Sequence, residues 1–204
     1  MVSPPKFIRS IFSSVLWNIP TEEKILYLSF DDGPNPKTTP WVVNELKKYN
    51  ALGTFFCIGE NMDKYPDMIK LLVDNKHTVS SHGYHHLNGW FSNTEKYVFN
   101  CIKGIELTDN KLFRPPYGKL KLRQYFKLKN KVKLVLWDVL SYDFNASSTI
   151  ECVNNIISNS TKGSIIVFHE NDKSENIMKE ALSQILLYYS EKGFVFKNIP
   201  RKSC

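Results

Sequence analysis

Short apolar runs alternate along the chain with stretches in which apolar residues recur every three or four positions. The short runs are typical of buried strands, and the periodic stretches are typical of amphipathic helices. The predicted strands cover residues 25–30, 53–59, 78–81, 112–113, 132–139, 164–168 and 194–199. The predicted helices cover residues 40–49, 66–74, 94–108, 120–129, 147–160 and 175–191.

This alternation predicts an α/β fold built on a parallel sheet, either open or closed. A complete eight-unit barrel usually needs about 250 residues, whereas this chain has 204. We therefore expect residues 25–204 to form one domain, a distorted (β/α) barrel with about seven parallel strands. Residues 1–24 form a basic and apolar N-terminal extension in this interpretation. In an open sheet or a barrel alike, the functional site lies at the carboxyl ends of the strands.

The composition is typical of a globular protein, with 42% hydrophobic and 23% charged residues. The net charge of +7 would suit nucleic acid, an anionic cell wall or acidic lipid as a partner. No nucleic-acid-binding motif is present, so we interpret the charge as a solvated, lysine-rich surface. The four cysteines form no CxxC pair. They are compatible with a reducing compartment but do not establish one.

The first 20 residues combine apolar patches with basic side chains, and no small-residue cleavage site follows them. No apolar run approaches the roughly 18 residues that a membrane span requires. We expect this segment to pack under the barrel or to contact a membrane surface. A cytoplasmic, a membrane-associated and an exported location all stay open.

Two adjacent carboxylates, Asp31 and Asp32, end the first predicted strand and precede a Gly-Pro turn. Successive strand side chains point in opposite directions, so one carboxylate can bind a metal while the other accepts a proton. The simplest alternative is a turn with two solvated acids, because Asp-Gly is a common turn pair.

Three histidines fall within five residues after the third predicted strand, and the outer two, His82 and His86, are four apart. Both rings can converge on one ion, and Asp32 would complete a set of three ligands. Three protein ligands leave a position open for water, as in a catalytic zinc site. A surface histidine cluster without a metal is the alternative. His85 is expected to point away.

Two further residues end or follow strands. His169 ends the run 164–168, and Arg114 stands before two prolines that hold the backbone rigid. An arginine in such a position is suited to orienting a carboxylate. Taken singly, His169 is equally typical of a satisfied core histidine, and Arg114 of a surface salt bridge.

Five short motifs occur together in one order: FDDG, HGYHH, RPPYG, WDVLSYD and VFHE. In order and spacing they resemble the polysaccharide deacetylases, the NodB-homology domains of carbohydrate esterase family four. The resemblance covers roughly residues 25–199. It implies a distorted (β/α) barrel that removes acetyl groups from N-acetylglucosamine polymers or acetylated xylan. It also implies a divalent metal cofactor, with zinc the first choice and cobalt the second.

The resemblance assigns roles to residues at matching positions. Asp31 is the expected general base and is positioned by Arg114, and His169 is the expected general acid. The backbone N–H of Tyr117 is expected to help hold the oxyanion. The expected metal ligands are Asp32, His82 and His86. The expected substrate-pocket residues are Trp137, Phe144, Val167 and Pro116.

The chain departs from the common family pattern at several positions. Leu140 stands where many members place an aspartate that supports the catalytic histidine, so Asp138 or Asp143 is expected to replace it. Phe144 replaces a usual tryptophan, and Glu170 a usual aspartate. Gly83 replaces a Ser or Thr. None of these changes removes an expected ligand, acid or base.

These observations predict a metal-dependent N-deacetylase that acts as a monomer on a peptidoglycan-like or chitin-like glycan. Two alternatives are an O-acetyl esterase of the xylan type and a catalytically impaired homologue that only binds glycans. The change at Leu140 is the main ground for the second. Nucleic acid is not an expected partner.

Overall fold

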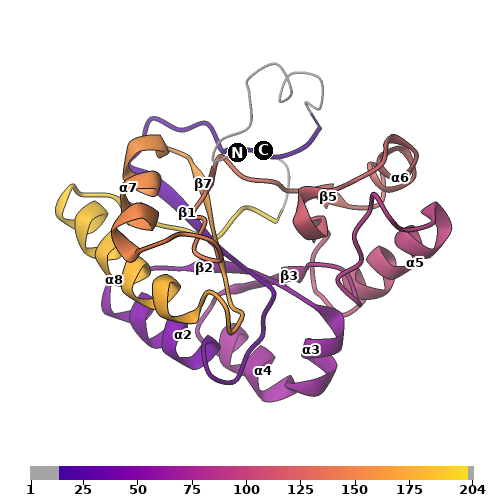
Figure 1. Cartoon of the computed structure of the whole chain (residues 1–204), viewed down its shortest axis with the longest axis horizontal. Coiled ribbons are helices and arrows are strands. Elements are labelled where there is room, and N and C mark those ends of the chain that lie inside the picture. Colours follow the sequence, from indigo (N-terminus) through magenta and orange to yellow (C-terminus); the bar gives the residue numbers. More distant parts are fainter. Residues whose placement is uncertain (1–13, 202–204) are drawn as a thin grey trace.

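The computed structural model describes residues 14–201. In this part of the chain, seven helices lie around a curved sheet (Figure 1). The strands are β1 (Ile25–Asp31), β2 (Gly53–Cys57), β3 (Thr78–Ser81), β4 (Leu112–Phe113), β5 (Lys133–Leu134), β6 (Val139–Leu140), β7 (Ile165–His169) and β8 (Val195–Phe196). The helices are α2 (Thr39–Lys48), α3 (Gly59–Lys64), α4 (Pro66–Asp74), α5 (Thr94–Ile105), α6 (Leu122–Leu128), α7 (Thr149–Asn159) and α8 (Glu175–Glu191). A short 3₁₀ turn covers Pro116–Gly118.

Seven strands pair in parallel in the order β5-β4-β3-β2-β1-β7-β6, and β8 pairs with the start of β1. The helices lie outside the curl of this sheet (Figure 1). The predicted fold class, a distorted (β/α) barrel with seven parallel strands, is therefore confirmed. The order places β3, β2, β1 and β7 side by side, which brings the polar residues at their carboxyl ends to one rim.

Strand β1 is the centre of the core, and every one of its seven residues is buried. Phe30 stacks on Phe55 of β2 at 4.8 Å and on Phe168 of β7 at 6.0 Å between ring centroids. The largest apolar cluster joins these rings to the inner faces of α2 and α8. Packing on both faces explains why β1 and β7 appear in the sequence as nearly continuous apolar runs.

The prediction of one strand over residues 132–139 is wrong. This run contains two short strands, β5 and β6, which lie at opposite ends of the sheet. Residues 135–138 connect these two ends of the sheet. An apolar run indicates that its whole length is buried, but it does not indicate which neighbouring strand each half pairs with.

The N-terminal extension packs on the barrel over its described part. Leu16 exchanges backbone hydrogen bonds with Leu134 and Leu136, and the Ile19 N–H donates to the Gly163 carbonyl at 2.9 Å. Residues 14–19 therefore bridge the chain that follows β5 and the turn before β7. Residues 1–13, which belong to the predicted membrane-contacting segment, lie outside the described residues.

Most predicted elements agree with the structure to within a few residues, and β3, α4, β4 and α8 agree at both ends. Helix α3 has no predicted counterpart. Asn93 rather than Thr94 caps α5, with its side chain accepting from the Glu95 N–H at 2.9 Å. Among residues 14–201, no helix has the length and apolar character needed to cross a bilayer.

Two glycines with positive φ offer a test of the N-terminal junction. A Cβ at Gly163 (φ +81°) would lie 2.0 Å from the Ile19 carbonyl oxygen, whereas at Gly193 (φ +76°) it would meet only the Lys24 ammonium at 3.9 Å. We expect Gly193→Ala to cost about 1–2 kcal/mol, the usual cost of the left-handed conformation. We expect Gly163→Ala to cost more, on the order of 3 kcal/mol, because the N-terminal segment must also move. Urea unfolding measures both, and equal losses would contradict this view of the junction.

Candidate active site

Four strand ends supply the candidate residues. Asp31 is the last residue of β1 and pairs in register with His169, the last residue of β7. His82 directly follows β3, and Arg114 directly follows β4. Asp31, His82 and Arg114 are all buried. The carboxyl rim of the sheet thus brings together residues that are more than 130 positions apart in the sequence.

The three expected metal ligands converge. The Asp32 Oδ1 atom lies 3.2 Å from His86 Nε2 and 3.7 Å from His82 Nε2. Within residues 14–201, these three form the one cluster whose ligand atoms all lie within 4.8 Å of one another. Two imidazole nitrogens and one carboxylate oxygen suit zinc or another borderline divalent metal. As predicted, His85 turns away and pairs with Glu60 at 3.0 Å.

The His82 ring is held in the tautomer that a metal requires. Its Nδ1 lies 2.9 Å from the Arg114 carbonyl oxygen, which can only accept a hydrogen bond. Nδ1 therefore carries the proton, and the Nε2 lone pair faces Asp32. Burial lowers the pKa of His82 to about 4, so the ring is neutral near pH 7. The donor set is consequently prepared to bind a cation.

Asp32 is oriented by two asparagines that the sequence analysis did not select. The Asn171 amide donates to Asp32 Oδ2 at 2.7 Å, which leaves Oδ1 for the histidines. Asn61 donates to the Asp32 backbone carbonyl at 3.0 Å. Burial alone would raise the pKa of Asp32, but the His86 hydrogen bond, His82 and His169 together hold it well below its usual range. The carboxylate therefore stays ionised.

Asp31 is held by the fully buried Arg114. The guanidinium donates to Asp31 Oδ1 at 2.6 Å and to the Ser29 hydroxyl at 2.9 Å. It also donates to the Leu136 carbonyl at 3.1 Å and lies 4.0 Å above the Phe56 ring centroid. The other oxygen, Asp31 Oδ2, lies 3.9 Å from His82 Nε2. One oxygen of the carboxylate is thus anchored while the other faces the candidate metal position.

His169 is supported by Asp143, which decides between the two aspartates named above. Asp143 Oδ1 lies 2.7 Å from His169 Nδ1, and Oδ2 accepts from the His169 backbone N–H at 2.7 Å. Asp138 instead accepts a hydrogen bond from the Ser164 hydroxyl. Burial would lower the pKa of His169, but the Asp143 charge and hydrogen bond outweigh it and raise the pKa to about 9.

The residues expected to hold the oxyanion and to line the acetyl pocket lie around the candidate site. Their side chains differ in solvent exposure. The exposed Tyr117 ring is 4.7 Å from the His86 ring, and the Phe144 ring stands edge-on to His169 at 4.8 Å. The Trp137 ring packs on Gly118. Val167 and Pro116 are buried. Their assignment to an acetyl pocket stays a prediction.

Glu170, which stands in place of a usual aspartate, supports the turn after β1. Its buried carboxyl accepts from the Thr39 hydroxyl at 2.8 Å and lies against Gly33. Its backbone N–H donates to the Asp31 carbonyl at 2.8 Å. Burial raises the pKa of Glu170 to about 8, so this carboxyl is mostly neutral at pH 7. A longer acid therefore fits without adding a third charge beside Asp31 and Asp32.

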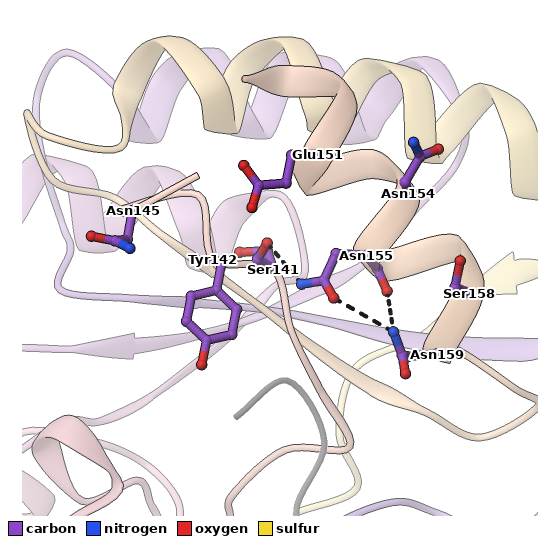
Figure 2. Close-up of a pocket in the computed structure, with 8 residues that line it drawn as sticks. All are labelled: Ser141, Tyr142, Asn145, Glu151, Asn154, Asn155, Ser158 and Asn159. Carbon is purple, nitrogen blue, oxygen red and sulfur yellow. Dashed lines mark hydrogen bonds between the residues drawn. The ribbon is translucent and has the colours of Figure 1, made fainter. Parts of the chain in front are cut away.

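A polar pocket of about 640 Å³ opens between α7 and the chain that follows β6 (Figure 2). Its lining is rich in amide and hydroxyl groups: Ser141, Tyr142, Asn145, Glu151, Asn154, Asn155, Ser158 and Asn159. Asn155 donates to the Leu140 carbonyl at 2.9 Å and so covers the free edge of β6. The Tyr142 ring lies 5.6 Å from Phe144, which connects this pocket to His169.

Three supporting residues were missed by the sequence analysis, namely Ser29, Asn61 and Asn171. Ser29 lies two residues before Asp31 on the same face of β1, so period-two spacing could have suggested it. Asn171 follows VFHE by one position and could have been included with that motif. Asn61 lies on α3, and no local sequence signal connects it to Asp32.

Comparisons with known proteins point to one family. A family model described as polysaccharide deacetylase matches residues 18–134. Two Bacillus cereus proteins named peptidoglycan-N-acetylglucosamine deacetylase are 32% and 30% identical to the chain. The first alignment covers 85% of this chain and 66% of the relative, just under two thirds of its length, and the second covers 91% of each.

A solved structure shows the same fold. It is a crystal structure of a peptidoglycan N-acetylglucosamine deacetylase in complex with 4-naphthalen-1-yl-N-oxidanyl-benzamide. It aligns with a TM-score of 0.85 at 29% identity, over 92% of this chain and 91% of that one.

The contact between His169 and Asp143 can be tested by titration. We expect Asp143→Asn to lower the pKa of His169 from about 9 by roughly 1–3 units, because the opposite charge is removed. Because this pKa lies above that of an unfolded histidine, the pair stabilises the fold fully below about pH 6.5. That contribution is lost as the pH rises through about 9. An NMR titration of the His169 ring measures the shift. Asp138→Asn is the matched control, and an equal shift in both variants would refute the assignment.

Proposed function

Because the chain belongs to the polysaccharide deacetylase family, we propose that it is a metal-dependent hydrolase of N-acetylated glycans. Its substrate would be the N-acetylglucosamine units of a peptidoglycan-like or chitin-like polymer. The B. cereus relatives are named for peptidoglycan N-acetylglucosamine, which supports this choice. The zinc ion is the first expectation for the metal and cobalt the second.

One observation carries the proposal: a carboxylate and a protonated histidine flank the cluster of Asp32, His82 and His86. Asp31 and His169 are paired residues on neighbouring strands, so both face the same rim. Hydrolysis of an amide needs a base for the attacking water and an acid for the leaving nitrogen. Arg114 anchors Asp31 and Asp143 anchors His169, so both side chains are held at this rim.

The residues divide the reaction between them. A divalent metal, when bound, supplies Lewis-acid polarisation of the acetyl carbonyl and a lowered pKa of its water. Asp31 accepts the proton of the water that attacks the carbonyl carbon. The Tyr117 N–H helps to hold the oxyanion that forms, a contribution of about 2.7–4 kcal/mol for one such donor. His169 then donates its proton to the glucosamine nitrogen, the carbon–nitrogen bond breaks, and acetate and a free amine leave.

The raised pKa of His169 supports an amide rather than an ester as the substrate. An amide nitrogen leaves poorly until it is protonated, whereas an alkoxide or alcohol needs less help. A pKa near 9 keeps His169 protonated at neutral pH. A pocket of about 490 Å³ beside the cluster, lined by Asp32, His86 and Asn171 among others, leaves room for a sugar ring.

One observation weighs against the alternative of a catalytically impaired homologue. That alternative relied on Leu140 in place of a supporting aspartate. Asp143 provides the same kind of support through two hydrogen bonds of 2.7 Å.

Removal of the metal is the first test of the proposed function. We expect a strong chelator to abolish acetate release and added zinc or cobalt to restore it, because water is a poor nucleophile without the cation. Acetate release should be measured on chitin, peptidoglycan and acetylated xylan fragments in parallel. Full activity in the presence of chelator would contradict the metal role, and release from xylan alone would favour the O-acetyl esterase.

Replacement of the base separates catalysis from metal binding. We expect Asp31→Asn to lower kcat by at least about 100-fold, the usual contribution of a general base. Zinc affinity should change little, because Asp32, His82 and His86 remain. Acetate release and zinc titration together measure the two effects. Asp32→Asn is the matched comparison and should weaken both. If Asp31→Asn weakened zinc binding as strongly as Asp32→Asn, the base assignment would fail.

A further inference from the structure

The net charge of the protein is concentrated in one segment. Seven lysines and arginines fall between Lys119 and Lys133, and no Asp or Glu occurs from residue 110 to residue 137. The chain has 27 basic and 20 acidic residues in total, so the 20 basic residues outside this segment match the acidic ones in number. The segment contains α6, which with α5 forms the right-hand end of the molecule in Figure 1.

Large apolar side chains are exposed within the same region. Leu122 and Phe126 are four residues apart on one face of α6, and they are 62% and 61% exposed. Trp90 and Phe91, in the loop before α5, are 56% and 84% exposed. A folded domain exposes single apolar residues freely, but several large ones beside a basic helix indicate an interaction surface.

Several of these side chains are in contact, and we call the region that they share the α6 surface. Trp90 and Leu122 line one apolar cavity, which joins the loop to the helix. The Lys119 ammonium lies 5.0 Å from the centroid of the Trp90 ring, and Lys129 lies 5.1 Å from that of Phe126. The α6 surface consists of Trp90, Phe91, Lys119, Lys121, Leu122, Arg123, Phe126, Lys127, Lys129, Lys131 and Lys133.

Within residues 14–201, one salt bridge neutralises a cation of this surface. Lys127 pairs with Glu95, in the first turn of α5, at 2.9 Å. Two other basic side chains are engaged differently, since Lys121 donates to the Ser92 carbonyl at 2.8 Å and Lys119 lies over Trp90. Both interactions leave the positive charge unneutralised. The surface therefore keeps a strong positive potential.

We propose that the α6 surface binds an anionic lipid bilayer. Leucine and aromatic side chains flanked by lysine and arginine are the pattern of a segment that lies in a membrane interface. A soluble polyanion would use the charges but would leave Leu122, Phe126 and Phe91 in water. A bilayer satisfies both features, because the apolar side chains enter the acyl boundary while the cations meet anionic headgroups.

Bilayer binding would hold the active site beside the membrane. The apolar cavity of the α6 surface is also lined by Pro115 and Gly118 of the turn that carries Tyr117. The surface and the active-site rim are thus adjacent. The bound protein would act on substrates close to the lipid surface. This inference does not depend on the reaction that the site performs.

Vesicle sedimentation of the full chain tests the proposal at physiological ionic strength. We expect binding to vesicles of phosphatidylcholine mixed with phosphatidylglycerol, and little binding to phosphatidylcholine alone. Each cation near an anionic bilayer strengthens binding about fivefold, so Lys121→Gln, Arg123→Gln and Lys129→Gln together should weaken it about 100-fold. Leu122→Ser with Phe126→Ser should weaken it at least about tenfold. All five positions are exposed, and circular dichroism melting confirms that the variants are folded.

A charge-matched control separates a local surface from net charge. Lys47→Gln, Lys70→Gln and Lys192→Gln remove the same charge from exposed positions on or after other helices. This triple variant should bind vesicles like the unmodified protein. Equal weakening by both triple variants would overturn the proposal in favour of non-specific attraction. If the Leu122→Ser, Phe126→Ser variant bound vesicles as well as the unmodified protein, the bilayer proposal would be overturned. The surface would then be a site for a soluble polyanion. Binding that survives all α6 changes would assign it to another segment.

Discussion

The buried guanidinium of Arg114 is the interaction on which the barrel and its candidate site both depend. It is fully excluded from solvent, so its charge requires compensation inside the protein. Asp31 supplies the opposite charge, and Ser29 and the Leu136 carbonyl accept two further N–H groups. Removing one partner of such a pair typically costs about 3–5 kcal/mol, because the other charge is left buried and unpaired.

The same residue connects three parts of the structure that are distant in sequence. Its side chain joins β1 to the segment that connects β5 to β6. Its backbone carbonyl accepts from His82 and so fixes the tautomer of a candidate metal ligand. The position of that segment, the position of the Asp31 carboxylate and the orientation of the His82 ring are therefore set by one residue. A change that moved Arg114 would disturb all three together.

Two adjacent carboxylates and a neighbouring glutamate would repel one another at a buried rim without separate compensation. Each is neutralised in a different way. Asp31 pairs with Arg114, and Asp32 faces His82 and His86, where a cation can bind. Glu170 is kept mostly protonated by burial. For His169 the charges are reversed, because the negative charge of Asp143 keeps this histidine protonated. This separation of charges allows Asp31 and His169 to lie side by side on neighbouring strands with opposite compensation.

The amino-acid sequence by itself determined the fold class, because buried strands and amphipathic helices leave different periods in the chain. It also predicted which residues share one rim, since Asp31, Asp32, His82, Arg114 and His169 all end or follow strands that a parallel sheet brings to one edge. The same reasoning included Asp138, which instead pairs with Ser164 before the start of β7. Only the tertiary structure decided that residues 132–139 divide into β5 and β6 at opposite ends of the sheet, because hydrophobicity does not specify a pairing partner. Only the tertiary structure selected Asp143 over Asp138 as the partner of His169, and joined Asn61 and Asn171 to Asp32. Such contacts depend on where single loop side chains point. The folded backbone sets that orientation, and the local sequence does not encode it.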